Sequence, residues 1–313
     1  MTTDAAETAL VAETAGSREG SVLPRARRVP RTGHRSVGER PSGAATAILL
    51  VGALYCLLPV LWVVVASTKS GSELFSTFTF APSAHLLDNV ADLNAYRGGL
   101  FWRWMANTAL YAGVGAMLSV VVSSMAGYAL AKYRFRGKTA VFNMLLAGVL
   151  VPGVVLAIPQ YLLLAQVGLT NTYWAVLLPS IISPYGIYLA RIYAGASIPD
   201  EIVEAARTDG ASELRTFAQV AMPMMAPGLV TVFLFQFVAI WNNFMLPYIM
   251  LGDDKLFPLT VGLSGLLNQG ASQPALYTLV ITGALLSIVP LVALFLLLQR
   301  YWQVDLAAGA VKA

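Results

Sequence analysis

The stretch SIPDEIVEAARTDG, residues 197–210, separates two long uncharged regions, residues 139–190 and 216–252. Ser197 has a side chain suited to a helix cap, and a proline follows in what would be the first turn. Gly210 is suited to the other end, because glycine adopts the left-handed backbone of a helix terminus at little cost. The sequence predicts a short acidic helix, closed by a glycine turn, between two hydrophobic spans.

Composition places this helix in a membrane protein. Of the 313 residues, 57% are hydrophobic and 12% are charged, about half the charged fraction of a typical soluble domain. A spanning helix needs about 20 apolar residues, and the uncharged regions provide six such segments, with a polar break at residues 168–171. We therefore predict an all-α integral membrane fold with six transmembrane helices. The expected spans are residues 47–66, 107–130, 141–164, 173–193, 228–251 and 277–298.

The distribution of basic residues sets the expected orientation. With the N-terminus inside, 16 of the 20 Lys and Arg residues fall on the cytoplasmic side. This excess agrees with the positive-inside rule. Both termini and the segment at 197–210 are therefore predicted to be cytoplasmic, and the net charge of +4 needs no nucleic-acid partner to explain it.

The two ends of the chain differ in composition. Residues 1–43 are rich in Ala, Gly, Ser, Thr and Arg without apolar periodicity, which predicts a disordered cytoplasmic tail. An arginine cluster at residues 25–40 can touch anionic lipid headgroups, although fixing the orientation is the simpler role. Residues 44–313 are predicted to form one membrane domain.

A second helix is expected after the glycine turn. Ser212 can cap it, and Leu214, Phe217 and Val220 recur at helical spacing. Pro223 is expected to bend the chain into the fifth span. Residues 197–223 would thus form a helix–Gly–helix elbow, either a solvated loop or a docking element for a partner with a basic cleft.

Prolines and small residues recur in the other spans. A helix interrupted by proline survives in lipid only where neighbouring groups satisfy its backbone, and broken helices often line transporter cavities. For any one proline, a packing kink without function is the simpler reading. Small residues suit close helix contacts. The prolines are Pro59, Pro152, Pro159, Pro179, Pro184, Pro247 and Pro290, and the small residues are Gly113, Gly115, Ser123, Ser124 and Gly127.

Catalytic and cofactor motifs are weak. Gly137-Lys138-Thr139 resembles the end of a phosphate-binding loop but lacks the preceding glycine and strand. His34 and His85 are predicted on opposite sides of the membrane, and the single Cys56 suits packing. We expect no catalytic or metal site. A secondary transporter is disfavoured, since the six spans hold no ionisable residue for ion coupling apart from Arg191 at the cytoplasmic end of the fourth. A non-transporting membrane subunit remains a further alternative.

The elbow resembles that of a known family. Glu204-Ala205-Ala206, Asp209-Gly210 and Met222-Pro223 resemble the "EAA" loop of ATP-binding cassette (ABC) importer permeases, and residues 198–212 resemble the carbohydrate-importer branch, the maltose-type inner-membrane subunits. The motifs at residues 107–110, 127–131, 241–242 and 308–312 agree with that family. Met222 replaces the commoner Leu, and Ala313 the usual final Gly.

This resemblance implies a permease subunit of an ATP-driven importer of mono- or oligosaccharides in the bacterial cell membrane. The elbow would be the coupling helix, in which Glu204 pairs with a basic residue of a cytoplasmic ATPase while Ala205 and Ala206 permit close approach. Asp209 and Pro223 complete the motif, and Gly210 makes the turn. The implied partners are a homologous second permease, two ATP-binding cassette subunits and an extracytoplasmic binding protein. ATP and Mg²⁺ would bind the ATPase, and no cofactor this chain.

The expected substrate path rests on side-chain chemistry. Sugar sites combine amides with flat aromatic faces, which makes Asn107, Trp241, Asn242 and Asn243 the candidates. Helix capping remains an alternative for Asn107. Interhelical hydrogen bonding and packing remain alternatives for residues 241–243.

Overall fold

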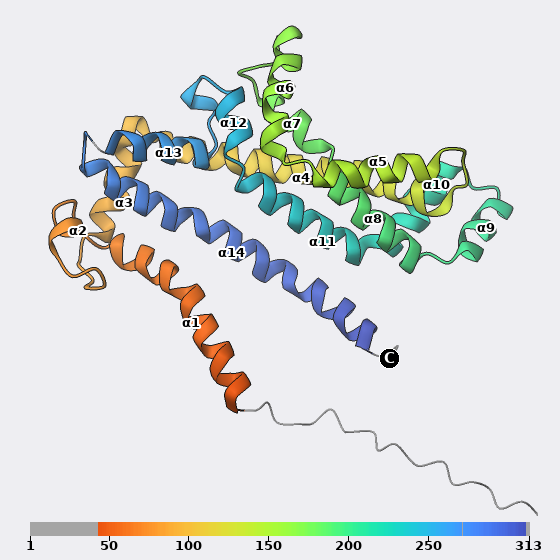
Figure 1. Ribbon diagram of the computed structural model, residues 1–313, viewed down its shortest axis with the longest axis horizontal. Coiled ribbons are helices and arrows are strands. Elements are labelled where there is room, and N and C mark those ends of the chain that lie inside the picture. The colour runs from red at the N-terminus through yellow and green to blue at the C-terminus, as the bar shows by residue number, and fades with distance from the viewer. Residues whose placement is uncertain (1–42, 271, 311–313) are drawn as a thin grey trace, which may run out of the picture. The chain divides into compact units, whose positions relative to one another are not determined.

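The computed structural model describes residues 43–270 and 272–310. The predicted disordered tail therefore lies outside the described residues, apart from Gly43. Within the described ranges every regular element is helical (Figure 1). Residues 53–313 form one compact unit, and the arrangement below concerns that unit.

The core is built on α4, which covers Leu100–Lys132. Along it lie α7 (Tyr173–Ile181), α8 (Pro184–Ser197) and α11 (Met222–Trp241). Glycine permits this packing, because a Cβ added at Gly127 would lie 2.6 Å from the backbone nitrogen of Arg191. The small residues predicted for helix contact thus include a true crossing point at Gly127. Gly113, by contrast, has no atom within 4 Å of an added Cβ.

The third predicted span is not one straight helix. It consists of α5 (Lys138–Leu150) and α6 (Gly153–Gln166), which meet at an angle of 105°. The bend follows from Pro152, because proline restricts the residue before it and cannot continue the hydrogen-bond ladder. The helix α5 packs on α8, while α6 turns away from the bundle (Figure 1). The predicted span over residues 141–164 is therefore a bent pair of helices, not one continuous helix.

The fourth span has a break of its own between α7 and α8. Ser183 accepts a hydrogen bond from the Gly186 amide, and Pro184 occupies the first turn of α8. The two helices together still count as one candidate span, Tyr173–Ser197. The prolines at residues 152 and 184 therefore mark real interruptions, whereas Pro59, Pro159, Pro179 and Pro290 lie inside helices.

The fifth span begins earlier than predicted. Residues 213–241 form one candidate span, made of α10 (Glu213–Thr216), the π turn η2 (Phe217–Ala221) and α11. No bend occurs at Pro223, because the flanking Ala221 and Met222 keep right-handed helical backbone angles. Proline is tolerated there because it lies in the first turn of α11. The expected bend and the 228–251 boundaries are thus corrected.

The remaining elements lie at the two ends of the core. In Figure 1, α9 (Asp200–Thr208) and α10 lie at one end of the bundle, while α3 and α13 lie at the other. The helix α14 (Ala275–Ala310) runs back along α11. The other elements are α1 (Gly43–Ala66), α2 (Glu73–Ser76), α3 (Leu86–Ala95), η1 (Tyr96–Gly98), α12 (Met245–Met250), η3 (Asp254–Leu256) and α13 (Leu259–Gly270).

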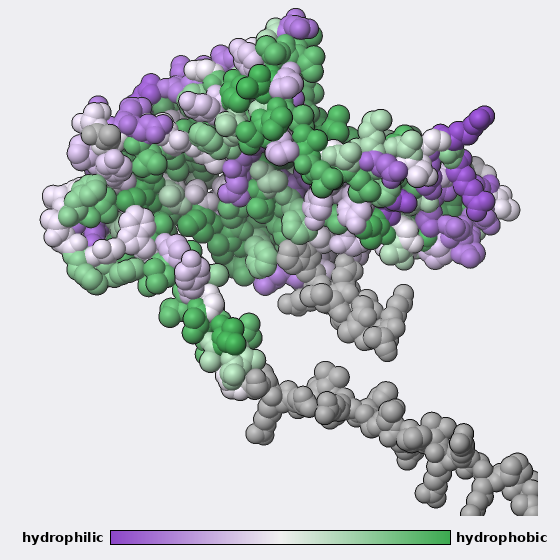
Figure 2. All heavy atoms as spheres, viewed as in Figure 1, coloured by the Kyte–Doolittle hydropathy of each residue, from purple (hydrophilic) through white to green (hydrophobic). Residues whose placement is uncertain are grey.

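Length and hydropathy support a multi-pass protein. Five helices within the described ranges are long and apolar enough to cross a membrane, and the bent α5–α6 pair makes six if it counts as one span. Figure 2 shows the apolar surface over the body of the bundle and a hydrophilic surface around α9 and α10. The prediction of six spans therefore holds in number only with the bent pair included.

Candidate functional site

The first candidate site is the helix–Gly–helix elbow. Its first helix, α9, contacts the bundle through Val203, which is 3% exposed, whereas Glu204 and Ala205 face outward. Ala206 is half-buried. The most distinctive part of the motif therefore lies where a partner can reach it, on a helix whose opposite face is held by apolar packing.

The turn after α9 is closed by its own backbone. The Ala211 amide donates to the Ala206 carbonyl and the Gly210 amide donates to the Arg207 carbonyl, at 3.0 Å each. This pair of bonds is a Schellman motif, which needs a left-handed residue at the position of Gly210, and its φ is +79°. The predicted role of Gly210 is confirmed.

The two predicted caps of the elbow have different outcomes. Ser212 caps α10 as expected, since its hydroxyl accepts from the Arg215 amide. Ser197 does not cap α9, because it is the last residue of α8 and Pro199 occupies the cap position. Of the predicted apolar face, Phe217 is buried while Leu214 is 68% exposed. The second part of the elbow therefore packs on the bundle through Phe217 and not through Leu214.

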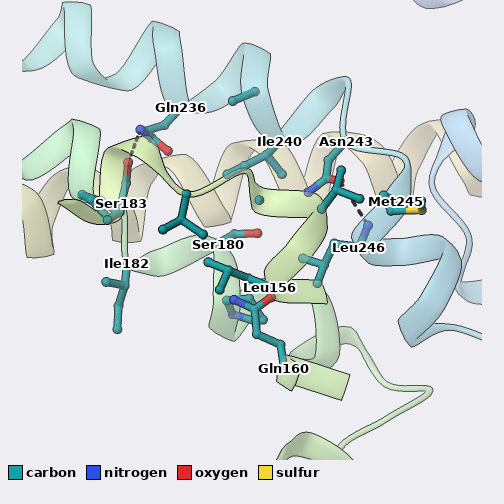
Figure 3. Close-up of a pocket in the computed structure, with 17 residues that line it drawn as sticks. Leu156, Gln160, Ser180, Ile182, Ser183, Gln236, Ile240, Asn243, Met245 and Leu246 are labelled. Atoms are coloured by element: carbon teal, nitrogen blue, oxygen red, sulfur yellow. Dashed lines mark hydrogen bonds between the residues drawn. The ribbon is translucent and has the colours of Figure 1, made fainter. Parts of the chain in front are cut away.

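The second candidate site is a cavity at the helix breaks. It has a volume of about 440 Å³ and is lined by both interrupted spans and by the end of α11. Figure 3 shows Gln160 and Leu156 from α6, Ser180 and Ser183 from α7 and its break, and Gln236 from α11 around it. No Asp, Glu, Lys or Arg lines this cavity. The fold therefore brings neutral amides and hydroxyls together within an apolar region.

Several of these polar groups are already oriented. The Gln236 amide nitrogen donates to the Ser183 hydroxyl at 2.6 Å, which in turn accepts from the Gly186 amide (Figure 3). The Asn243 side-chain oxygen accepts from the Leu246 amide at 3.4 Å. Amides fixed in this way can present their remaining donors and acceptors to a hydroxylated ligand.

Only one of the four sequence candidates lines this cavity, namely Asn243. Asn107 is 4% exposed, and its amide nitrogen donates to the carbonyls of Lys255 and Phe257. Its oxygen accepts from the Tyr173 hydroxyl at 3.1 Å. These three bonds occupy the Asn107 amide on both sides, so it anchors the η3 turn instead of facing the cavity.

The other two candidates have local roles. Trp241 is 4% exposed and stacks on Phe237 with ring centroids 5.5 Å apart. Asn242 caps the end of α11, where its side chain donates to the Val238 carbonyl at 2.9 Å. The packing alternative therefore describes Trp241, whereas Asn242 caps its own helix and makes no interhelical hydrogen bond to any described residue of the kind expected as its alternative.

The sequence reading missed the polar residues that do line the cavity. Gln160 and Gln236 are single amides within long apolar segments, and Ser183 directly precedes a proline. A lone amide in a spanning helix is a usable signal because polar groups at membrane depth are costly and commonly functional. The four sequence candidates follow instead from matching amides and aromatic faces to the chemistry of a sugar.

In the part of the chain that the structure describes, the motifs that could suggest a nucleotide or metal site are not arranged to bind one. The Lys138 ammonium donates to the carbonyls of Ala131 and Tyr133, so it closes the loop before α5. Gly137 directly precedes that helix, and α4 lies before the loop where a phosphate-binding loop needs a strand. Among the described residues, no three His, Cys, Asp or Glu side chains are grouped for a metal ion.

Comparisons with known proteins agree with this architecture. The family model for the binding-protein-dependent transport system inner membrane component matches residues 119–303. The arabinooligosaccharides transport system permease protein AraQ of Halalkalibacterium halodurans is 35% identical, over 83% of this chain and 92% of that protein. The lactose transport system permease protein LacG of Rhizobium radiobacter is 30% identical, over 85% and 94%.

A solved structure has the same fold. It is that of a bacterial ABC transporter involved in the import of the acidic polysaccharide alginate, with a TM-score of 0.70 and 25% sequence identity. The match covers 83% of this chain and 95% of that chain. The bent and interrupted spans, the exposed elbow and these matches lead to one conclusion: the chain belongs to the inner-membrane components of binding-protein-dependent transport systems, the permeases of ABC importers.

Proposed function

We propose that this permease forms one half of the membrane path of an ATP-driven importer for neutral mono- or oligosaccharides. As a family member, the chain is a multi-pass inner-membrane transport subunit and not an enzyme. Relatives named for arabinooligosaccharides and lactose support sugar as the substrate class. The main observation that supports a sugar path through this chain is the uncharged cavity at the two helix breaks.

The chemistry of the cavity suits a sugar. Neutral carbohydrates offer many hydroxyls and no charge, so amides and hydroxyls fixed in an apolar wall match them. Gln160, Gln236 and Asn243 are the residues proposed to meet them. A secondary carrier would need an ionisable coupling group at such a site, and the lining residues include none.

The elbow is the proposed docking point for the ATPase. Glu204 and Ala205 are exposed on a helix that begins and ends with defined backbone geometry. In this proposal Glu204 pairs with a basic residue of the ATPase, and the small Ala205 and Ala206 let the two surfaces approach. ATP and Mg²⁺ bind to that subunit. Closure of the ATPase dimer then shifts the permease between inward- and outward-facing states.

The proposed assembly contains two membrane chains. A homologous permease supplies the other half of the path, two ATP-binding cassette subunits bind from the cytoplasm, and a binding protein delivers the sugar from outside. The distribution of Lys and Arg supports the orientation with both termini and the elbow inside. The exposed side of α6, where Leu162 and Leu163 are 57% and 64% exposed, suits contact with the second permease or with lipid.

The test replaces Glu204 with Lys in the complete transporter. We expect normal membrane insertion, loss of ATPase subunits during purification, and loss of uptake of arabinotriose and lactose by cells. Glu201→Lys is the matched control, because Glu201 is exposed on the same helix and undergoes the same charge reversal. Retention of the ATPase with normal uptake in Glu204→Lys would contradict the docking role.

A further inference from the structure

The elbow is joined to the end of α4 by an ion pair. The Lys132 ammonium, at the last residue of α4, lies 2.7 Å from the Asp200 carboxylate, at the first residue of α9. The Lys132 side chain is 8% exposed, whereas that of Asp200 is 75% exposed. The cation is therefore fixed in the bundle, and the elbow supplies the partner that it meets.

A second connection involves both helices of the elbow, α9 and α10. The Tyr133 hydroxyl donates to the Glu213 carboxylate at 2.6 Å. The Arg207 guanidinium donates to both oxygens of the same carboxylate, at 2.8 and 3.2 Å. Glu213 therefore links the end of α9, the start of α10 and the residue that follows α4, across the turn at Gly210.

Aromatic packing supports these polar contacts. The Tyr128 ring, on α4, lies 5.6 Å from Tyr133 and 5.5 Å from Phe217. Val203 of α9 belongs to the same buried cluster. The elbow thus contacts α4 through a small apolar core as well as through its ion pairs.

The protonation states favour the contacts at neutral pH. The hydrogen bond and charge of Lys132 lower the pKa of Asp200, so this carboxylate stays ionised down to acidic pH. Burial, followed by the hydrogen bond to Glu213, raises the pKa of Tyr133, so its hydroxyl keeps the proton that it donates. Both connections therefore persist across the physiological pH range.

Helix α4 is well placed to carry motion through the bundle. It has 33 residues, about 50 Å at 1.5 Å per residue, and it packs along α8 and α11. Near its other end, Asn107 and Tyr111 bond the carbonyls of Lys255, Leu256 and Phe257. A displacement applied at Lys132 would therefore reach the far end of the unit.

We propose that Lys132 and Tyr133 are positioning residues that attach the elbow to α4, so that movement of α9 is passed directly to α4 as well as along the chain into α11. The inference rests on the proposed ATPase docking at the elbow. It adds a second mechanical route, from Asp200 and Glu213 into α4, to the covalent connection through α10.

The experiment measures the movement of α4 itself. The complete transporter carries spin labels at Met117→Cys in α4 and Val292→Cys in α14, both exposed positions, after replacement of Cys56 by Ser. The inter-label distance is compared without nucleotide and after trapping with ATP and vanadate. The test variants are Tyr133→Phe, Lys132→Glu and Asp200→Lys, together with the Lys132→Glu/Asp200→Lys charge swap.

In the labelled transporter with Lys132, Tyr133 and Asp200 intact, we expect the inter-label distance to change when nucleotide is trapped. In each single variant the shifted population should fall about two- to five-fold, the range expected for losing one partly exposed ion pair or hydrogen bond. The charge swap should recover at least half of the loss, which a merely structural defect would not allow. Tyr55→Phe and Arg136→Glu are controls, because Tyr55 is 79% exposed and Arg136 is an exposed residue of the same basic loop.

Two results would overturn the inference. One is an inter-label distance that does not change with nucleotide, and the other is a distance change in the single variants equal to that of the unmodified protein. Failure of the proposed function looks different. It would appear as ATPase subunits that remain bound to the Glu204→Lys variant, with a normal distance change.

Discussion

The contacts of α4 and of α5 with the same helix, α8, differ in kind. Where α4 crosses α8, glycine brings the two backbones together and leaves no space for a Cβ at Gly127. In contrast, α5 has no buried residue and meets α8 through side chains. Its Phe142 ring contacts the Arg191 guanidinium, 3.6 Å from the ring centroid, and also stacks with the Tyr188 ring. The first contact is rigid, and the second can separate without opening the core.

This difference assigns separate tasks to the two regions. A bundle of α4, α8 and α11 can transmit a displacement, because close-packed backbones have few alternative arrangements. The bent pair α5–α6 has a large exposed surface and borders the cavity. We infer that it is the part of this chain that moves most easily during transport.

The largest effect is expected at the rigid crossing. Gly127→Val should destabilise the protein by more than about 3 kcal/mol, because the new side chain would meet the backbone of Ala190 and Arg191. Thermal unfolding in detergent measures this loss. Gly113→Val on the same helix is the matched control, since nothing lies within 4 Å of its Cβ position. Equal stability of the two variants would refute the rigid crossing.

A smaller effect is expected where α4 holds the η3 turn. Asn107→Ala should cost about 2 kcal/mol, because the Phe257 carbonyl loses its Asn107 donor and the Tyr173 hydroxyl loses its acceptor, while the Lys255 carbonyl keeps only Arg103. Hydrogen exchange of residues 253–259 should rise in this variant, which reports local release. Asn242→Ala, which removes an exposed cap, should leave that segment protected. A protected turn in Asn107→Ala would mean that the other donors suffice to hold it, namely Arg103, Trp104 and Tyr111, which bond the carbonyls of Lys255, Asp254 and Leu256.

The contact between α5 and α8 is expected to contribute less to the stability of the protein. Phe142→Ala removes the ring that contacts Arg191 and Tyr188, for a loss of about 1 kcal/mol. Hydrogen exchange should increase in α5 and stay unchanged in α4. Phe135→Ala in the exposed basic loop serves as the control. Increased exchange throughout α4 would show that the two contacts are not independent.

The smallest change in stability, below about 1 kcal/mol, is expected for Gln236→Leu. The side chains have similar volume, and the replacement removes both the Gln236 donor and the need for a partner. Sugar uptake should nevertheless fall, because the cavity loses a fixed amide. Concentration-dependent uptake of arabinotriose and lactose tests this, with Gln166→Leu as the control, because Gln166 is exposed and does not line the cavity. Unchanged uptake would remove Gln236 from the path.

Sequence patterns predicted the elements whose signals are local. Apolar segments marked the spans, and the residues around Gly210 and Ser212 marked the elbow, because helix ends depend on a few adjacent side chains. Ser197 misled the reading, since it resembles a cap but continues α8. Asn107 misled it in another way, because an amide that suits a sugar equally suits backbone carbonyls 148 residues away.

The sequence by itself determined that this is a helical membrane protein with an exposed acidic elbow, since hydropathy, charge bias and glycine or proline positions act over a few turns of chain. Only the tertiary structure decided that Pro152 bends α5–α6 by 105° and that Gln236 meets Ser183. It alone also decided that Lys132 and Tyr133 reach across to Asp200 and Glu213. The physical reason is distance along the chain: these contacts join residues 53 to 80 positions apart, and packing, not local preference, brings them together.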